Sequence, residues 1–181
     1  MPRRRLSQGN GEIFHVTNRS VRRVPIFCDD RDYRAFQKVL VAALERVPTR
    51  LIGFCVMPNH WHLVLWPRAD ELSRFMHRLT LMHSKRWHLA RRVTGTGALY
   101  QGPYRAFSVY SHEALLRVML YVEQNPVRAG LVYRAESWQW SSLWTRCNES
   151  RVVPLSEWPI AVPEDWLDRV NRRVYSTRNR V

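Results

Sequence analysis

The sequence predicts an α+β domain in which an antiparallel sheet carries helices packed on one face. Short runs rich in aromatic and β-branched residues alternate along the chain with longer stretches whose apolar residues recur at helical spacing. Two of the short runs are separated only by Pro58-Asn59, which suits a turn between adjacent antiparallel strands. The 181 residues are enough for one domain with a sizeable core.

Most of the expected elements have a local signal at one end. In chain order they are a strand at 12–18, a helix at 29–47, strands at 50–57 and 60–66, a helix at 71–92, a strand at 100–110 and a helix at 112–124. Asp29 or Asp30 can cap the first helix, and Pro48 ends it. Ser111 can cap the last helix, which we expect to end at Gln124 because a residue that precedes proline is pushed out of helical geometry.

This order of elements matches the ferredoxin-like, split-βαβ arrangement. From about Trp138 onward the chain is rich in Trp, Pro and Arg and has no sustained period, so we expect it to wrap the domain and to end in a basic C-terminal tail. The predicted organisation is a basic N-terminal arm at 1–11, one domain at 12–146 and a Trp/Pro/Arg-rich tail at 147–181.

The chain is strongly basic, with 29 Lys and Arg against 15 Asp and Glu and a net charge of +14. Only Lys38 and Lys85 are lysine, and the other cations are arginine. Arginine grips phosphate and guanine edges through paired hydrogen bonds and stacks on bases, although a GC-rich genome would also enrich it. We therefore predict a nucleic-acid partner.

Cysteine usage and hydropathy bear on the compartment. Cys28, Cys55 and Cys147 are far apart, which argues against a zinc ribbon or a disulfide framework and suits a reducing environment. The sequence shows neither a secretory signal nor an apolar run near the roughly 20 residues that a membrane span needs. We expect a cytoplasmic, nucleoid-associated protein with no membrane partner.

The segment from Met57 to Trp66 carries the strongest chemical signal. His60 and His62 stand two apart in an expected strand, so their imidazoles leave the same face and form half of a divalent metal site. Tyr121 and Asn125 are four apart, so they share a helix face if the last turn of that helix holds. A tyrosine beside such a site suggests attack of the phenolate on a phosphodiester, which a metal ion assists by neutralising phosphate charge.

The product of this reaction would be a covalent phosphotyrosine, which retains the phosphodiester energy, so rejoining would need no nucleotide cofactor. Histidine and oxygen ligands permit Mg²⁺, Mn²⁺ or another divalent ion. Asn125 is a weaker ligand than a carboxylate, so a water molecule between it and the ion is an alternative to direct coordination. A paired HxH also occurs by chance, and the remaining histidines, His15 among them, are expected to be structural or on the surface.

Several motifs occur in a fixed order along the chain. They are Phe14-His-Val-Thr-Asn-Arg19, Pro25-Ile-Phe27 with Asp30 and Tyr33, Met57-Pro-Asn-His-Trp-His62, Gln101-Gly-Pro-Tyr-Arg105, Tyr121-Val-Glu-Gln-Asn-Pro-Val-Arg-Ala-Gly-Leu131 and Trp140-Ser-Ser142. Together they resemble the REP-associated tyrosine transposases, a branch of the single-tyrosine HUH transposases. The resemblance spans about residues 12–146 and departs from the family at Ser20, where a glycine is expected.

The resemblance implies a ferredoxin-like HUH domain with a defined set of site residues. His60 and His62 correspond to the metal ligands, Tyr121 to the nucleophile, and Asn125 to the third-ligand position. The implied cofactor is Mg²⁺ or Mn²⁺, and the implied substrate is single-stranded hairpin DNA of repetitive extragenic palindromes. The implied activity is endonuclease and strand transfer, by a monomer or a homodimer.

Arginines are the expected DNA contacts. The candidates are Arg3, Arg4, Arg5, Arg19, Arg22, Arg23, Arg78, Arg105, Arg172 and Arg173. The basic tail either clamps DNA or covers the site.

Three other functions compete with this interpretation. A domesticated relative would bind hairpins without cutting them, although such a binder has no need of both histidines and the tyrosine. A histidine-triad nucleotide hydrolase needs a further alternating histidine, but Val64 occupies that position and no glycine-rich phosphate loop is present. A structural zinc site lacks a cysteine pair.

Overall fold

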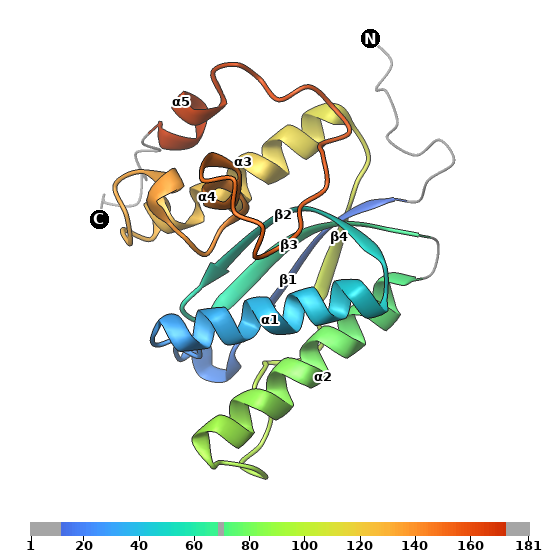
Figure 1. Ribbon diagram of the computed structural model, residues 1–181, viewed down its shortest axis with the longest axis vertical. Coiled ribbons are helices and arrows are strands. Elements are labelled where there is room, and N and C mark those ends of the chain that lie inside the picture. Colours follow the sequence, from blue (N-terminus) through green and yellow to red (C-terminus); the bar gives the residue numbers. More distant parts are fainter. Residues whose placement is uncertain (1–11, 69–70, 173–181) are drawn as a thin grey trace, which may run out of the picture.

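The computed structural model describes residues 12–68 and 71–172, which form a four-stranded sheet with helices on both of its faces (Figure 1). The strands are β1 (Ile13–Arg19), β2 (Thr49–Met57), β3 (His60–Pro67) and β4 (Arg105–Val109). They are ordered β2-β3-β1-β4, and every neighbouring pair is antiparallel. The α+β class and the ferredoxin-like strand order expected from the sequence are confirmed.

The helices form two layers rather than one. α1 (Asp30–Arg46) and α2 (Glu71–Arg91) cover one face of the sheet, as expected, and α3 (His112–Arg128) lies across the other (Figure 1). Each layer has its own apolar cluster. Trp61 packs in one cluster with residues of α1 and α2, and Val64 packs in the other with residues of α3. A helix on the second face was not anticipated, because strand alternation does not say which helix covers which face.

The expected end of α3 at Gln124 is wrong, because the helix continues through Pro126 to Arg128. Pro126 lacks a backbone N–H, so the ladder loses one bond, but the N–H of Ala129 donates to the carbonyl of Asn125 at 2.9 Å. Gln124 is buried, and its Nε2 donates to the carbonyl of Arg169 at 3.1 Å. Tertiary packing therefore holds the last turn in place against the local preference.

β4 is shorter than the expected strand at 100–110. Tyr100 forms only an isolated bridge with Ser20, and Gly102-Pro103 interrupts the pairing because proline cannot donate to the ladder. The segment at 100–104 remains tied to β1 through the N–H of Gln101, which donates to the carbonyl of Arg19 at 2.9 Å. This loop therefore borders the end of β1.

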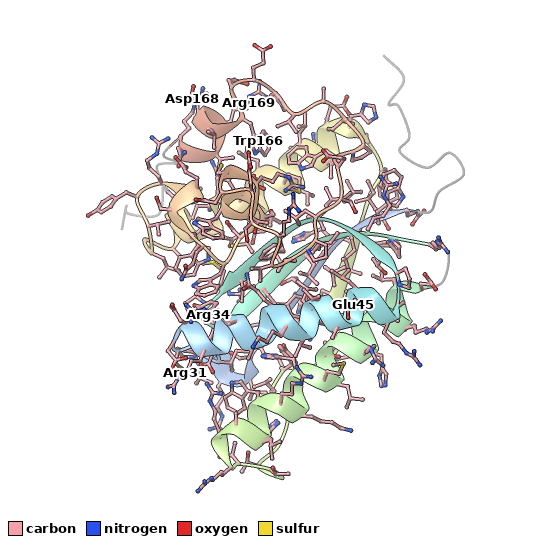
Figure 2. The ribbon with its side chains drawn as sticks, in the orientation of Figure 1. Arg31, Arg34, Glu45, Trp166, Asp168 and Arg169 are labelled. Carbon is pink, nitrogen blue, oxygen red and sulfur yellow. The ribbon has the colours of Figure 1, made fainter. Side chains whose placement is uncertain are left out.

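The segment after Trp138 wraps the domain, as expected, and contains α4 (Ser142–Cys147) and α5 (Trp166–Asn171). Both helices are fixed to α3 through Glu123, whose carboxylate accepts from Ser142 Oγ at 3.0 Å and from Trp166 Nε1 at 2.8 Å. Burial raises the pKa of this carboxyl group. Figure 2 shows Asp168 and Arg169 on the outer side of α5, whereas Trp166 is buried.

Candidate active site

Antiparallel register gathers the candidate residues on the face that α3 covers. Thr17 of β1 lies opposite His62 of β3 and opposite Arg105 of β4. Two residues further along β1, Arg19 lies opposite His60. Residues opposed across an antiparallel pair point to the same face, so polar side chains from three strands meet here.

His60 and His62 lie side by side, as strand alternation predicts, with ring centroids 5.0 Å apart. Burial, with a smaller contribution from the Arg19 charge, lowers the pKa of His60 to about 4. Burial, with contributions from His15 and His60, holds the pKa of His62 well below its usual value. Both imidazoles are therefore neutral near pH 7 and keep a lone pair that can bind a metal.

His15 belongs to the site, and sequence reasoning missed it. Its Nε2 lies 3.0 Å from Nδ1 of His62, and the two rings stack with centroids 5.1 Å apart. Burial lowers the pKa of His15 to about 4. The sequence does show that His15 and Thr17 share a strand face, but only the register against β3 shows that this face meets His62.

The contact with His15 leaves one ring nitrogen of His62 without a partner. Nε2 of His62 is buried and has no hydrogen bond within the described residues. An unsatisfied buried polar atom costs about 1–3 kcal/mol, so this nitrogen is a candidate ligand for a metal ion or a water molecule.

Tyr121 and Asn125 of α3 lie beside the histidine pair, and Asn125 is part of the helix because α3 continues past residue 124. The ring centroid of Tyr121 is 5.4 Å from that of His62, and its side chain is 41% exposed. Asn125 Nδ2 donates to the carbonyl of Tyr121 at 2.8 Å, which fixes the orientation of the amide because a carbonyl only accepts. A hydrogen bond between the Asn125 side chain and His60 tends to raise the pKa of that histidine, against the effect of burial.

The donor set fits a divalent cation. It consists of two neutral imidazoles and an amide oxygen, and one imidazole nitrogen is a buried lone pair without a partner. No group of three His, Cys, Asp or Glu side chains that could hold a metal occurs within the described residues. The third ligand beside His60 and His62 would therefore be Asn125 or a water molecule bound to Asn125.

A pocket of about 490 Å³ opens beside Tyr121 and His62. Its lining residues are Thr17, Asn18, Arg19, Arg23, His62, Gln101, Gly102, Pro103, Arg105 and Tyr121. Three of these residues are arginines and none is acidic, so the pocket is suited to an anionic ligand.

The remaining arginine candidates are not part of this pocket. Arg22 lies next to Arg23 but does not line it, Arg78 is on α2 at the opposite face, and Arg172 follows α5. The candidates Arg3, Arg4, Arg5 and Arg173 lie outside the described residues.

A comparison with known families identifies the chain. Residues 11–125 match the family model described as "Transposase IS200 like". The chain belongs to the IS200-like transposase family. No curated protein matches it significantly.

Two solved structures are similar to the chain. One is described as "Structure of the REP associates tyrosine transposase bound to a REP hairpin", with a TM-score of 0.64, 17% sequence identity, and 91% of this chain and 94% of that chain covered. The other is a putative transposase from Deinococcus radiodurans R1, with a TM-score of 0.48, 18% identity, and 68% and 96% covered. The first similarity confirms, at the level of the fold, the resemblance to REP-associated transposases. Within the described residues, no helix of this IS200-like transposase is long and apolar enough to cross a membrane.

Proposed function

We propose that this IS200-like transposase cleaves and rejoins single-stranded DNA at REP-type hairpins through a covalent phosphotyrosine at Tyr121, with the help of a divalent metal ion. One observation carries the proposal: Tyr121 lies beside His62, whose buried Nε2 has no partner within the described residues, at an arginine-lined pocket. Family membership supports the same chemistry. The solved structure with a similar fold, which has a REP hairpin bound, supports the substrate.

The pocket positions the DNA backbone. Arg19, Arg23 and Arg105 line it, and a guanidinium binds two phosphate oxygens at once. Holding the scissile phosphate next to Tyr121 converts a bimolecular attack into an intramolecular one, which lowers the barrier substantially.

The bond changes then occur at phosphorus. Oη of Tyr121 attacks, so that a P–Oη bond forms while the bond from phosphorus to the sugar oxygen of the departing strand breaks. The phenolic proton passes to solvent, which reaches the half-exposed Tyr121, and the departing oxygen leaves as a hydroxyl group. Rejoining reverses these changes: a strand-end hydroxyl attacks the phosphotyrosine and restores the phenol.

His60, His62 and Asn125 are the residues that would hold Mg²⁺ or Mn²⁺, the last directly or through water. When bound, the ion neutralises charge on a non-bridging phosphate oxygen and aligns the scissile bond. His15 positions His62, because its contact with Nδ1 fixes the ring and Nε2 would remain available to hold the ion.

One chain is sufficient to assemble this site. Tyr121 lies beside His62 and His15 of its own chain, so we expect a monomer to be active and do not require a homodimer. We propose that residues 12–146 form the catalytic unit. Of the predicted tail at 147–181, α5 packs against α3 through Trp166, and residues 173–181 lie outside the described part.

The test is incubation of the full chain with labelled single-stranded REP-type hairpins in Mn²⁺, Mg²⁺ or chelator. We expect a protein–DNA adduct that survives denaturation and that is lost with chelator and in Tyr121→Phe. An adduct that forms equally well in Tyr121→Phe would contradict the assignment of the nucleophile.

A hairpin-binding protein that does not cut is the second candidate. The observation that favours it is that no group of three His, Cys, Asp or Glu side chains within the described residues is arranged to hold a metal ion, although His15 lies beside the histidine pair. Tight binding of several hairpins with no adduct in any metal would support this alternative.

A further inference from the structure

Phe107 of β4 lies on the same face of the sheet as the candidate active site. It lies opposite His15 in the β1–β4 register, and the two ring centroids are 6.1 Å apart. The ring of His15 is in turn 5.9 Å from that of Tyr121. Phe107 is therefore two ring-to-ring steps from the proposed nucleophile, a span that one or two nucleotides can cover.

The Phe107 ring is exposed where most of the sheet is covered. Its side chain is 54% exposed, and β4 is the last strand in the order β2-β3-β1-β4, so no described strand pairs with its outer edge. The His15 ring meets it at a tilt of 34°, so the two rings are not stacked face to face. A single exposed apolar side chain is ordinary, so the exposure of Phe107 suggests a binding role only together with the residues beside it.

The neighbour on the same strand face is Arg105. It precedes Phe107 by two residues, is exposed, and lines the pocket beside Tyr121. Proteins that bind single strands combine cations that track the backbone with aromatic rings on which bases stack. With no acidic side chain among the pocket's lining residues, the pair offers a flat apolar surface and a phosphate-binding cation side by side.

We infer that Phe107 and Arg105 form a subsite for one unpaired nucleotide of the substrate, with the base stacked on Phe107 and its phosphate held by Arg105. This inference rests on the proposed function, because it places one nucleotide of a single-stranded substrate. It assigns to Phe107 a role in gripping the strand within one or two nucleotides of the scissile phosphate. No described strand pairs with the outer edge of β4, so its backbone can hydrogen bond to the same nucleotide.

The experiment measures binding without cleavage. The full chain carrying Tyr121→Phe, called the parent below, is titrated into short single-stranded oligodeoxynucleotides over a range of salt concentrations. Fluorescence anisotropy measures binding, and every further substitution is made in this parent. We expect Phe107→Ala to weaken binding by about 5- to 100-fold and Phe107→Trp to preserve it, because stacking on an aromatic ring contributes at this level.

Salt dependence separates the two partners of the subsite. Phe107→Ala should leave the slope of log Kd against log salt unchanged, whereas Arg105→Gln should reduce it by about 0.7 for one lost phosphate contact on a single strand. Tyr133→Ala is the matched control, because Tyr133 is an aromatic residue that is 93% exposed beyond the end of α3. That variant should bind like the parent.

A positional readout completes the test. Oligonucleotides with 2-aminopurine at successive positions should show one position that is quenched by the parent and not by Phe107→Ala. The inference is overturned if Phe107→Ala binds like the Tyr133→Ala control, or if Phe107→Leu binds as tightly as the parent. It is also overturned if Phe107→Ala changes only self-association, which would indicate that a second copy pairs with the β4 edge.

Failure of the inference can be told apart from failure of the proposed function. If the unsubstituted chain forms the adduct while Phe107→Ala binds normally, only the subsite is wrong. If neither the parent nor the unsubstituted chain binds any oligonucleotide, even at low salt, the proposed function fails and the subsite with it.

Discussion

Each face of the sheet buries a histidine, and the two histidines differ in how their hydrogen bonds are completed. His83 belongs to α2 and faces the sheet. Its Nδ1 lies 2.6 Å from Oη of Tyr100, which also accepts from Trp61 Nε1 at 2.9 Å. Beneath α3, Nδ1 of His62 contacts His15, but its Nε2 is buried with no partner in the described part of the chain. The residues Trp61 and His62 are adjacent, so one step along β3 separates the two environments.

Burial and pKa do not distinguish these two histidines. Burial lowers the pKa of His83 to about 3 and holds that of His62 well below its usual value, so both are neutral near pH 7. What differs is that the Tyr100 hydroxyl links Trp61 and His83 by hydrogen bonds, whereas His62 keeps a buried nitrogen with no partner in the described part of the chain, next to a cationic pocket. A perturbed pKa therefore marks burial here, and what sets His62 apart from His83 is this buried ring nitrogen without a partner among the described residues.

The largest effect should come from Tyr121→Phe. Removing Oη takes away the proposed nucleophile, so we expect complete loss of the covalent adduct on hairpin DNA, with the free energy of unfolding changed by less than about 0.5 kcal/mol because the side chain is partly exposed. Gel analysis of the adduct and urea unfolding measure the two quantities. Tyr133→Phe is the control and should cut normally. Residual adduct in Tyr121→Phe would move the nucleophile elsewhere.

A second prediction concerns the contact between His15 and His62. His15→Phe removes the partner of His62 Nδ1, so we expect Mn²⁺ affinity to fall by about 10- to 100-fold. His15→Gln should recover part of this loss, because a glutamine oxygen can accept from Nδ1–H. Titration of the metal-free protein with Mn²⁺ measures affinity in the absence of DNA, and His77→Phe on the exposed side of α2 is the control. Unchanged affinity in His15→Phe would mean that His15 only packs against the site.

The sequence was sufficient for those features that depend on local period. Alternation along a strand places His60 and His62 on one face whatever the partner strand is, and the ring distance of 5.0 Å agrees. The strand order of the sheet also follows from the order of elements along the chain. These features need no knowledge of long-range contacts.

Features that depend on register and packing could not be predicted in the same way. His15 reaches His62 only because β1 pairs with β3 in one register, which the whole sheet determines. The last turn of α3 holds because Gln124 is anchored to α5, far along the chain, and the local rule for residues before Pro126 does not include that contact. The same turn places Asn125 at the candidate site, so the error in the helix boundary concerns a residue that we propose as a metal ligand.

A third prediction contrasts the two buried histidines directly. His83→Leu leaves the hydroxyl of Tyr100 without its acceptor, so we expect the free energy of unfolding to fall by about 1–3 kcal/mol while the folded protein still cuts DNA. His62→Leu should show the reverse pattern, with cutting lost and a smaller change in stability, because removal of the unpartnered Nε2 offsets the loss of the Nδ1 contact with His15. Urea unfolding and the adduct assay on both variants measure this contrast. If His62→Leu is the less stable of the two, the distinction between the faces is wrong.

The smallest expected effect is the dependence of stability on pH that belongs to His83. Its pKa is about 3 in the folded protein and near 6.5 when unfolded, so below pH 6.5 the unfolded chain binds a proton that the folded chain does not. Stability that is present above pH 6.5 is therefore lost as the pH falls, by about 1 kcal/mol between pH 6.5 and 5.5 for this one group. His15, His60 and His62 have lowered pKa values as well and act in the same direction, so the wild-type slope contains all four. Urea unfolding of His83→Leu across this range should show a shallower slope of unfolding free energy against pH. The difference from wild type should equal the contribution of His83 alone. Parallel slopes would mean that His83 takes up a proton in the folded protein, and that burial does not keep it neutral over this pH range.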